Sequence, residues 1–293
     1  MVIPGRNSVA VHTSTETAAI GQVLGQYREV TALTERSHDA GGHAWSLAAT
    51  ADLLRIRGEL DDAAAQCPAA LAEAALLSDP QFRIFATMNC GQVAMDRGEL
   101  ETARSLIEES ARESEKAGVA VYAGNAQMVL AQMDQDASHW SQAGGRLEIA
   151  IKRFASIDER PGEATAQAML ALGAQANGDV MLRDRAMARA ASLRAASTSR
   201  EEVYLVDIAL AQLADKGVEK SSAVERLREL AADAQRRHWL SLALEAKLAA
   251  WRLLHLQGDA PAATELAQEI EPAARNHGFR RIQALLAGTT PPR

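Results

Sequence analysis

The chain is poor in aromatic residues, in cysteine and in lysine. Aromatic residues make up 4% of its 293 residues although 47% are hydrophobic, so the core must consist mainly of Ala, Leu and Met side chains, a composition that does not favour strands. Two cysteines are too few for a disulfide framework and favour a reducing compartment. Five lysines and a net charge of −7 provide no basic surface for duplex nucleic acid, so we expect no direct nucleic-acid binding by this region.

Long apolar runs and known catalytic motifs are absent as well. No stretch of about 20 apolar residues could span a membrane. The N-terminus has no charged start, apolar middle or cleavage site of a signal peptide, so we expect a cytoplasmic protein that does not enter a membrane. The sequence contains no glycine-rich phosphate loop, nucleophile elbow, zinc-binding His–Glu motif or kinase signature.

Few residues remain as candidates for chemistry. His38 and His43 lie close in sequence with Asp39 between them, but a metal site would need two more ligands, so an ordinary turn is favoured. Arg280 and Arg281 are interpreted as helix-end cations that favour the helix dipole. The sequence therefore predicts a protein that is not an enzyme and that carries no metal and no cofactor.

What the sequence does contain is a repeat with a period of 40 residues. The tetrapeptide Arg-Gly-Glu-Leu occurs at 57–60 and again at 97–100. The turn column at this period reads Gly58, Gly98, Ser138, Gly178, Val218 and Gly258. Five residues later stand Ala63, Ala103, Ala143, Arg183, Ala223 and Ala263, and seven residues earlier stand Ala51, Gly91, Ala131, Ala171, Ala211 and Trp251. Glycine ends one helix and frees the chain to turn, and small residues let two helices pack closely.

These columns resemble the tetratricopeptide repeat family, although the usual period there is about 34 residues. The longer repeat is similar to C-terminal helical arrays of bacterial signalling regulators and kinases. The resemblance implies an all-α fold, a right-handed α-solenoid of about six and a half helix-turn-helix repeats. It gives little indication of function, because such arrays bind many unrelated partners.

The columns also divide the chain into units. We expect a flexible tail at 1–16, a single superhelical domain at 17–287 and a second flexible tail at 288–293. Within the domain the predicted parts are a half repeat at 17–40, repeats at 41–80, 81–120, 121–160, 161–200, 201–240 and 241–278, and a capping helix at 279–287. The half repeat suggests that a further domain, such as a kinase, winged helix or ATPase, preceded this chain.

Cys67 and Cys90 fall on helices that pack together in such arrays, so the two thiols could come close. Both occupy core columns, where cysteine behaves as a small hydrophobic residue. We therefore expect free thiols in preference to a disulfide.

In arrays of this family the first helix of each repeat lines a concave groove. Carried onto this sequence, the groove has one apolar side and one side rich in glutamine and charge. The predicted groove residues are Trp45, Asp52, Arg55, Phe85, Met88, Gln92, Asn125, Met128, Gln132, Gln135, Gln175, Gln212 and Arg252. The aromatic residues and methionines are equally explained as core, whereas glutamine in a core would need partners. Trp251 is interpreted as structural.

Such a groove suits an extended peptide or a helix, so the first interpretation is a protein-binding scaffold in a bacterial regulator. An alternative is a small-molecule effector domain, for which a closed polar pocket would be expected. A third is self-association into a homodimer through an uncovered end helix.

Overall fold

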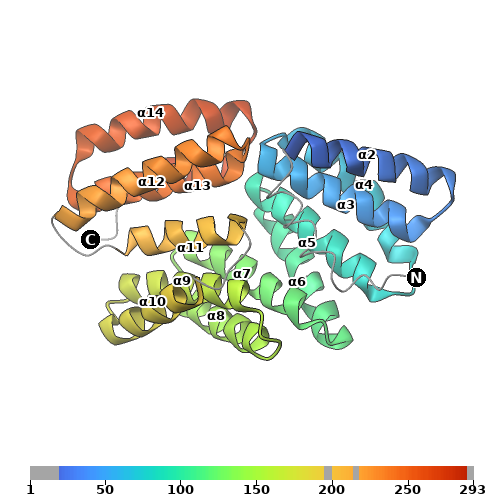
Figure 1. The fold of residues 1–293 in the computed structure, drawn as a ribbon, viewed down its shortest axis with the longest axis horizontal. Helices are drawn as coiled ribbons and strands as arrows, with labels where there is room; N and C mark the ends of the chain where they lie inside the picture. Colours follow the sequence, from blue (N-terminus) through green and yellow to red (C-terminus); the bar gives the residue numbers. More distant parts are fainter. Residues whose placement is uncertain (1–19, 195–199, 214–217, 289–293) are drawn as a thin grey trace.

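The computed structural model describes residues 20–194, 200–213 and 218–288 (Figure 1). The predicted tail at 1–16 and residues 289–293 of the predicted tail at 288–293 lie outside these ranges. The described residues form helices and turns, with no strand among them. The helices are α2 (Ile20–Arg36), α3 (Ala40–Arg57), α4 (Leu60–Leu76), α5 (Pro80–Asp96), α6 (Leu100–Ala117), α7 (Ala120–Asp136), α8 (Trp140–Ala155), α9 (Arg160–Ala176), α10 (Val180–Arg194), α11 (Arg200–Gln212), α12 (Val218–Arg236), α13 (Leu240–Gln257), α14 (Ala260–Asn276) and α15 (Arg280–Gly288).

The predicted fold class, an all-α solenoid of helical repeats, is confirmed. Consecutive helices pack against each other along the chain. First helices of the repeats begin at residues 40, 80, 120, 160, 200 and 240, which is the 40-residue period of the sequence. α2 occupies the register of a second helix, and α15 begins at residue 280, in the register of a first helix.

Left-handed residues end most of these helices. A residue with positive φ stands two positions before ten of the described helices; these residues are His38, Gly58, Gly98, Gly118, Ser138, Asp158, Gly178, His238, Gly258 and Gly278. At Gly58, φ is 88°, and the backbone N–H groups of Gly58 and Glu59 donate to the carbonyls of Arg55 and Leu54. The glycine column of the sequence thus marks turns within repeats, and a similar column with fewer glycines marks turns between them.

Small residues bring the helices close together. Ala63, Ala103, Ala143 and Ala263 are completely buried at the start of the second helices. Gly91 in α5 approaches α6 so closely that a Cβ atom there would lie 2.5 Å from Cδ1 of Ile107. Trp251, which replaces the small residue of this column, is buried in the C-terminal core.

The two ends of the array meet. α13 packs against α3, and α15 contacts α5 as well as α13 and α14; Figure 1 shows α13 and α14 curling back beside α3 and α4. Leu60 belongs to the same buried cluster as Phe279, and Nδ1 of His277 lies 2.9 Å from the carbonyl oxygen of Gly58. We call this contact the seam and define it by Gly58, Leu60, Leu240, His277 and Arg281.

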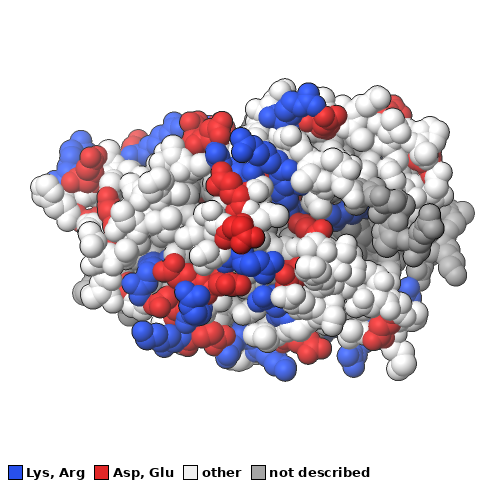
Figure 2. Space-filling view, turned by 180° about the vertical axis from the view of Figure 1, so that it is seen from behind, with Lys and Arg blue, Asp and Glu red and all other residues white. Residues whose placement is uncertain are grey.

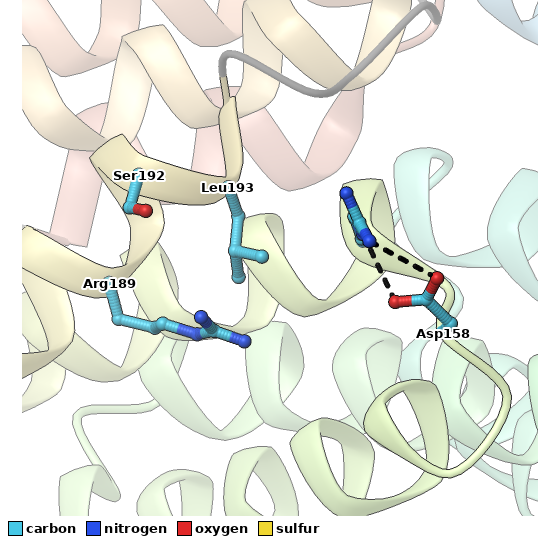
Figure 3. Close-up of a pocket in the computed structure, with 5 residues that line it drawn as sticks. Asp158, Arg189, Ser192 and Leu193 are labelled. Atoms are coloured by element: carbon cyan, nitrogen blue, oxygen red, sulfur yellow. Dashed lines mark hydrogen bonds and ion pairs between the residues drawn. The ribbon is translucent and has the colours of Figure 1, made fainter.

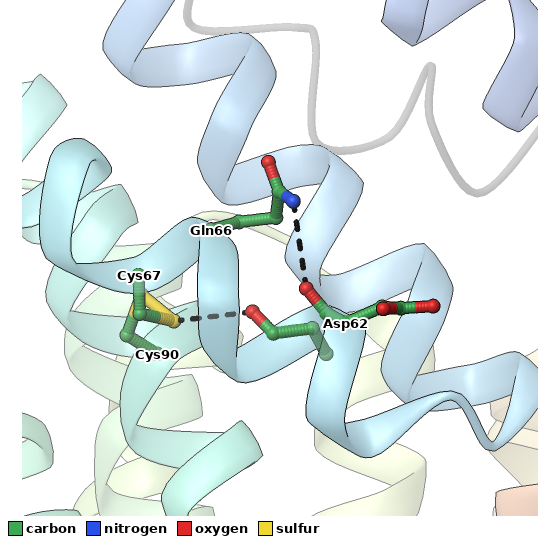
Figure 4. Close-up of a disulfide and its surroundings, with 5 residues drawn as sticks. Asp62, Gln66, Cys67 and Cys90 are labelled. Atoms are coloured by element: carbon green, nitrogen blue, oxygen red, sulfur yellow. Dashed lines mark hydrogen bonds between the residues drawn. A yellow bond between two sulfur atoms is a disulfide. The ribbon is translucent and has the colours of Figure 1, made fainter.

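The expectation of free thiols is wrong. Cys67 of α4 and Cys90 of α5 form a disulfide, with their Cα atoms 5.6 Å apart (Figure 4). The helices that carry them are neighbours in the stack, and both residues face the contact, so the core position that suggested a small hydrophobic residue also brings the sulfur atoms together. The argument from two cysteines for a reducing compartment therefore no longer holds.

Candidate functional site

The concave side of the array lines a partly open cavity of about 620 Å³. Each first helix from α3 to α13, together with α15, contributes residues to its wall. The apolar part of the wall includes Met95, Met128, Met169, Leu172, Leu205 and Ile208. The seam brings the two ends of the array together, so this space is a partly open central cavity.

A row of glutamines crosses the wall of the central cavity. Gln92 lies on α5, Gln132 and Gln135 on α7, Gln175 on α9 and Gln212 on α11. The side-chain nitrogen of Gln135 donates to the carbonyl oxygen of Met169 at 2.9 Å, and that of Gln132 donates to Asp136 at 3.1 Å. The 40-residue period brings these residues together, since equivalent positions of successive first helices face the same space.

Eight of the thirteen predicted groove residues line the cavity. They are Arg55, Gln92, Met128, Gln132, Gln135, Gln175, Gln212 and Arg252. Trp45, Asp52, Phe85, Met88 and Asn125 lie outside the cavity wall.

Packing within the first repeats explains why Trp45, Phe85 and Met88 lie outside the cavity wall. The Trp45 ring stacks on Phe85 with centroids 3.7 Å apart, and Phe85 meets Tyr122 edge to face. Phe85 and Met88 are 6% and 4% exposed, so they are core residues. The interpretation as core, which the sequence left open, holds for both.

Charged side chains gather where α15 enters the cavity. Arg281 is 5% exposed; its Nε lies 2.6 Å from Oδ2 of Asp136, and its Nη1 contacts Glu245 and lies 3.8 Å from Oδ1 of Asp96. Arg55 lies 3.2 Å from the other oxygen of Asp96, and Arg252 lies 3.5 Å from Asp136. The interpretation of Arg281 as a helix-end cation that favours the dipole is wrong, because it lies in the first turn of α15 and is neutralised by carboxylates of α5, α7 and α13.

Burial and charge act against each other in this cluster. Burial raises the pKa of Asp96 even though Arg55 and Arg281 act to lower it. Burial also disfavours the charge of Arg281, but Asp136, Glu245 and Asp96 together raise its pKa well above the ordinary value. Arg281 therefore stays charged and joins α15 to α5, α7 and α13. The sequence does not predict this role of Arg281, because its partners are far away in the chain. The available signal was that a helix starting at residue 280 keeps the 40-residue period.

A second, smaller pocket of about 240 Å³ lies beside α10. Figure 3 shows Asp158, Arg189, Ser192 and Leu193 on its wall. Asp158 pairs with Arg160 at 3.0 Å, and Arg189 pairs with Glu163 on α9 at 2.8 Å. These charges are already neutralised, so the pocket carries no argument for a ligand.

The residues weighed as metal ligands have other partners. Nδ1 of His43 lies 2.7 Å from Glu73, and Asp39 caps the first turn of α3 by accepting from the N–H of Gly42. His38 has positive φ in the turn before α3. Among the described residues, no group of three or more His, Cys, Asp and Glu side chains is arranged to hold a metal ion.

The surface carries charges of both signs. In Figure 2, Lys and Arg are interspersed with Asp and Glu, and a mixed band crosses the middle of that face. Several form linked groups, as where Arg104 and Arg146 both pair with the buried Asp134 at 2.9 and 2.7 Å. Within the described ranges, every helix is too short or too polar to cross a lipid bilayer.

Comparison with known proteins gives a likeness of fold. No family model matches the chain, and no curated protein matches it. Among solved structures it is similar to BtubC (BKLC) from P. vanneervenii, with 17% identity and a TM-score of 0.52 over 94% of this chain and 96% of that one. At this identity the likeness concerns the fold alone.

Proposed function

We propose that this chain is a non-enzymatic recognition domain that binds a short extended segment of a partner protein in the central cavity. The glutamine row carries this proposal: five side-chain amides from four successive first helices lie beside an apolar wall of methionine and leucine. Amides bind a peptide backbone, and a methionine-rich wall accepts side chains of varied shape. The likeness of the sequence columns to tetratricopeptide repeats supports the same reading.

Photo-crosslinking from two positions tests this proposal. A photoreactive amino acid replaces Met128, which lines the cavity, or Lys152, which is exposed on the second helix α8. In a lysate of a bacterial host, the group at position 128 is expected to crosslink one linear segment of one protein. The crosslink is expected to disappear when Gln92, Gln132 and Gln212 are replaced by alanine. Equal crosslinking from position 152, or none from position 128, would contradict the proposal.

A small-molecule effector domain is the second candidate, and the seam favours it. Closure of the array by α13 and α15 leaves a volume inside the range of about 300–1,000 Å³ that is typical of small-molecule pockets. Native mass spectrometry of the purified chain separates the two. A bound mass of a few hundred daltons supports the effector candidate.

The same spectrum reports the oligomeric state. Leu33 on the end helix α2 is 54% exposed, and this exposed apolar side chain is the reason that the homodimer is kept as a proposal. The cytoplasmic location and the membership of a bacterial regulatory protein likewise remain predictions.

A further inference from the structure

Helix α15 occupies a site that distant parts of the chain form around it. Its first turn lies against the turn at Gly98, where an added Cβ atom would lie 3.0 Å from Cβ of Arg280. Phe279, directly before the helix, and Ile282 within it are buried, and both belong to the apolar cluster that includes Leu60. The helix contacts α5, α13 and α14. It is therefore seated in the array as an inserted segment, and its contacts show what this site accepts.

The same site recognises a guanidinium group. Nε of Arg281 lies 2.6 Å from Oδ2 of Asp136, and its Nη1 atom contacts Glu245 and lies 3.8 Å from Oδ1 of Asp96. The three carboxylates come from α7, α13 and α5 and surround one planar group with several N–H donors. A lysine ammonium is a single compact charge and cannot reach carboxylates on three helices in this way. The site is therefore built for arginine.

Only a small part of α15 takes part in this contact. The helix has nine residues, the fewest of any described helix. The side chains after Ile282 are half-buried or exposed; they are Gln283, Ala284, Leu285, Leu286 and Ala287. The contact thus depends on the first turn and on the residue before it.

The buried ion pairs decide what could replace α15. Removing one partner from a buried ion pair is costly, although the intact pair adds little net stability. A competing helix without an arginine would leave Asp96, Asp136 and Glu245 buried without their common cation. A competing helix with an arginine at the same place would restore these pairs, so the exchange would cost little.

We infer that the α15 site is a docking site for a partner helix that carries an arginine, with an aromatic residue two positions before it and an apolar residue directly after it. Such a helix displaces α15, which matches this pattern in Phe279, Arg281 and Ile282 and is the chain's own competitor. The inference goes beyond the proposed function, because it requires no peptide at the glutamine row.

A synthetic peptide with the sequence of residues 278–288 is the probe. The full chain carries Arg281→Met, which loosens its own α15, and fluorescence anisotropy measures binding of the labelled peptide. The native peptide is expected to bind at least about tenfold more tightly than a peptide with Arg281→Met, and about fivefold more tightly than one with Arg281→Lys. A peptide with Arg280→Met is the matched control and should bind within about twofold of the native peptide, because Arg280 is exposed.

Two further chain variants locate the peptide and guard against loss of folding. Adding Asp136→Asn to the Arg281→Met chain removes one carboxylate and should reduce the preference for the arginine peptide to less than about threefold. A chain with Arg281→Lys keeps a cation at the seam, and it should also bind the native peptide. In this chain, hydrogen exchange of α15 should rise when the peptide is added, while α7 and α8 keep their protection. Circular dichroism melting shows which variants are folded.

Three results would overturn the inference. They are equal affinity of the arginine and methionine peptides, failure of the native peptide to bind a folded variant chain, and binding without a rise in the exchange of α15. Each of them leaves the photo-crosslinking result at position 128 unchanged, so failure of this inference is distinguishable from failure of the proposed function.

Discussion

The helix stack and the seam are held together by different kinds of contact. In the stack, small and apolar residues recur every 40 positions, and residues such as Leu147 and Ile107 are completely buried between neighbouring helices. At the seam, a buried arginine, a histidine and a close glycine turn join helices from opposite ends of the array. Stack contacts are local in sequence and non-directional, whereas the seam combines apolar contacts between distant residues, such as Leu60 with the cluster of Phe279, with a few directional ones. The stack should therefore tolerate change gradually, and the seam should open as a unit.

Replacing Arg281 should produce the largest effect, and only at the seam. Arg281→Met leaves Asp136, Glu245 and Asp96 without their common partner, and breaking a buried ion pair in this way costs about 3–5 kcal/mol. Hydrogen exchange should show loss of protection in α15, while α7 and α8 keep theirs. Arg280→Met, at the exposed neighbouring position, is the control; equal protection in both variants would contradict the proposed role of the seam.

A cavity in the stack should lower global stability instead. Leu147→Ala in α8 removes a completely buried side chain and should cost about 3 kcal/mol in the free energy of unfolding. Ile149→Ala on the same helix, where the side chain is 42% exposed, should cost less than about 0.5 kcal/mol. Urea unfolding measures both. Similar costs for the two variants would show that the alanine and leucine columns do not hold the stack together.

The disulfide reinforces the stack at a single place. Reducing Cys67–Cys90 should lower the stability of the native chain by about 3 kcal/mol, because the unfolded chain regains the freedom of the closed loop. A variant with both cysteines replaced by alanine should melt at the same temperature with and without reductant. The prediction fails if reductant leaves the melting temperature of the native chain unchanged.

Substitutions at two glycine turns distinguish the effect of backbone strain from the effect of disturbing the seam. Gly178 and Gly58 both have positive φ, but a Cβ atom at Gly178 meets nothing within 4 Å, whereas one at Gly58 would lie 2.5 Å from Cδ2 of Leu240. Gly178→Ala should therefore cost about 1 kcal/mol from strain alone. Gly58→Ala should cost more and should also expose α15 to hydrogen exchange. An unchanged exchange pattern in Gly58→Ala would show that the contact between Gly58 and Leu240 does not hold the two ends of the array together.

The smallest effect concerns pH. Burial raises the pKa of Asp96 above its ordinary value near 3.8, so the folded chain binds this proton more tightly than the unfolded chain does. Its contribution to stability is therefore complete below that ordinary value and is lost as pH rises through the folded value. Asp96→Asn should remove this part of the pH dependence of the urea midpoint. Identical pH profiles of the two chains would show that Asp96 ionises normally.

The difference between stack and seam also explains what could be predicted from the sequence. The helices, their register and most of the glutamine row follow from a period, because each residue such as Gln132 has an equivalent 40 positions away. Arg281 has no such column, and its contact with Asp136 spans 145 residues, so the period does not predict that contact. The prediction of free thiols was wrong for a related reason. Composition argued against a disulfide, and only the way in which α4 and α5 pack brings Cys67 and Cys90 together. Met88 stands 40 positions before the cavity residue Met128, and Phe85 stands 80 positions before the cavity residue Thr165, but local stacking with Trp45 and Tyr122 places Phe85 in the core.

The closed seam changes the mechanics of the array. An open solenoid behaves as a spring whose curvature changes smoothly, since every repeat contributes a small rotation. An array whose two ends are in contact cannot change its curvature in this way unless the contact at the seam is broken first. Widening the central cavity therefore requires the contacts of Arg281 and the close approach of Gly58 to Leu240 to be broken first.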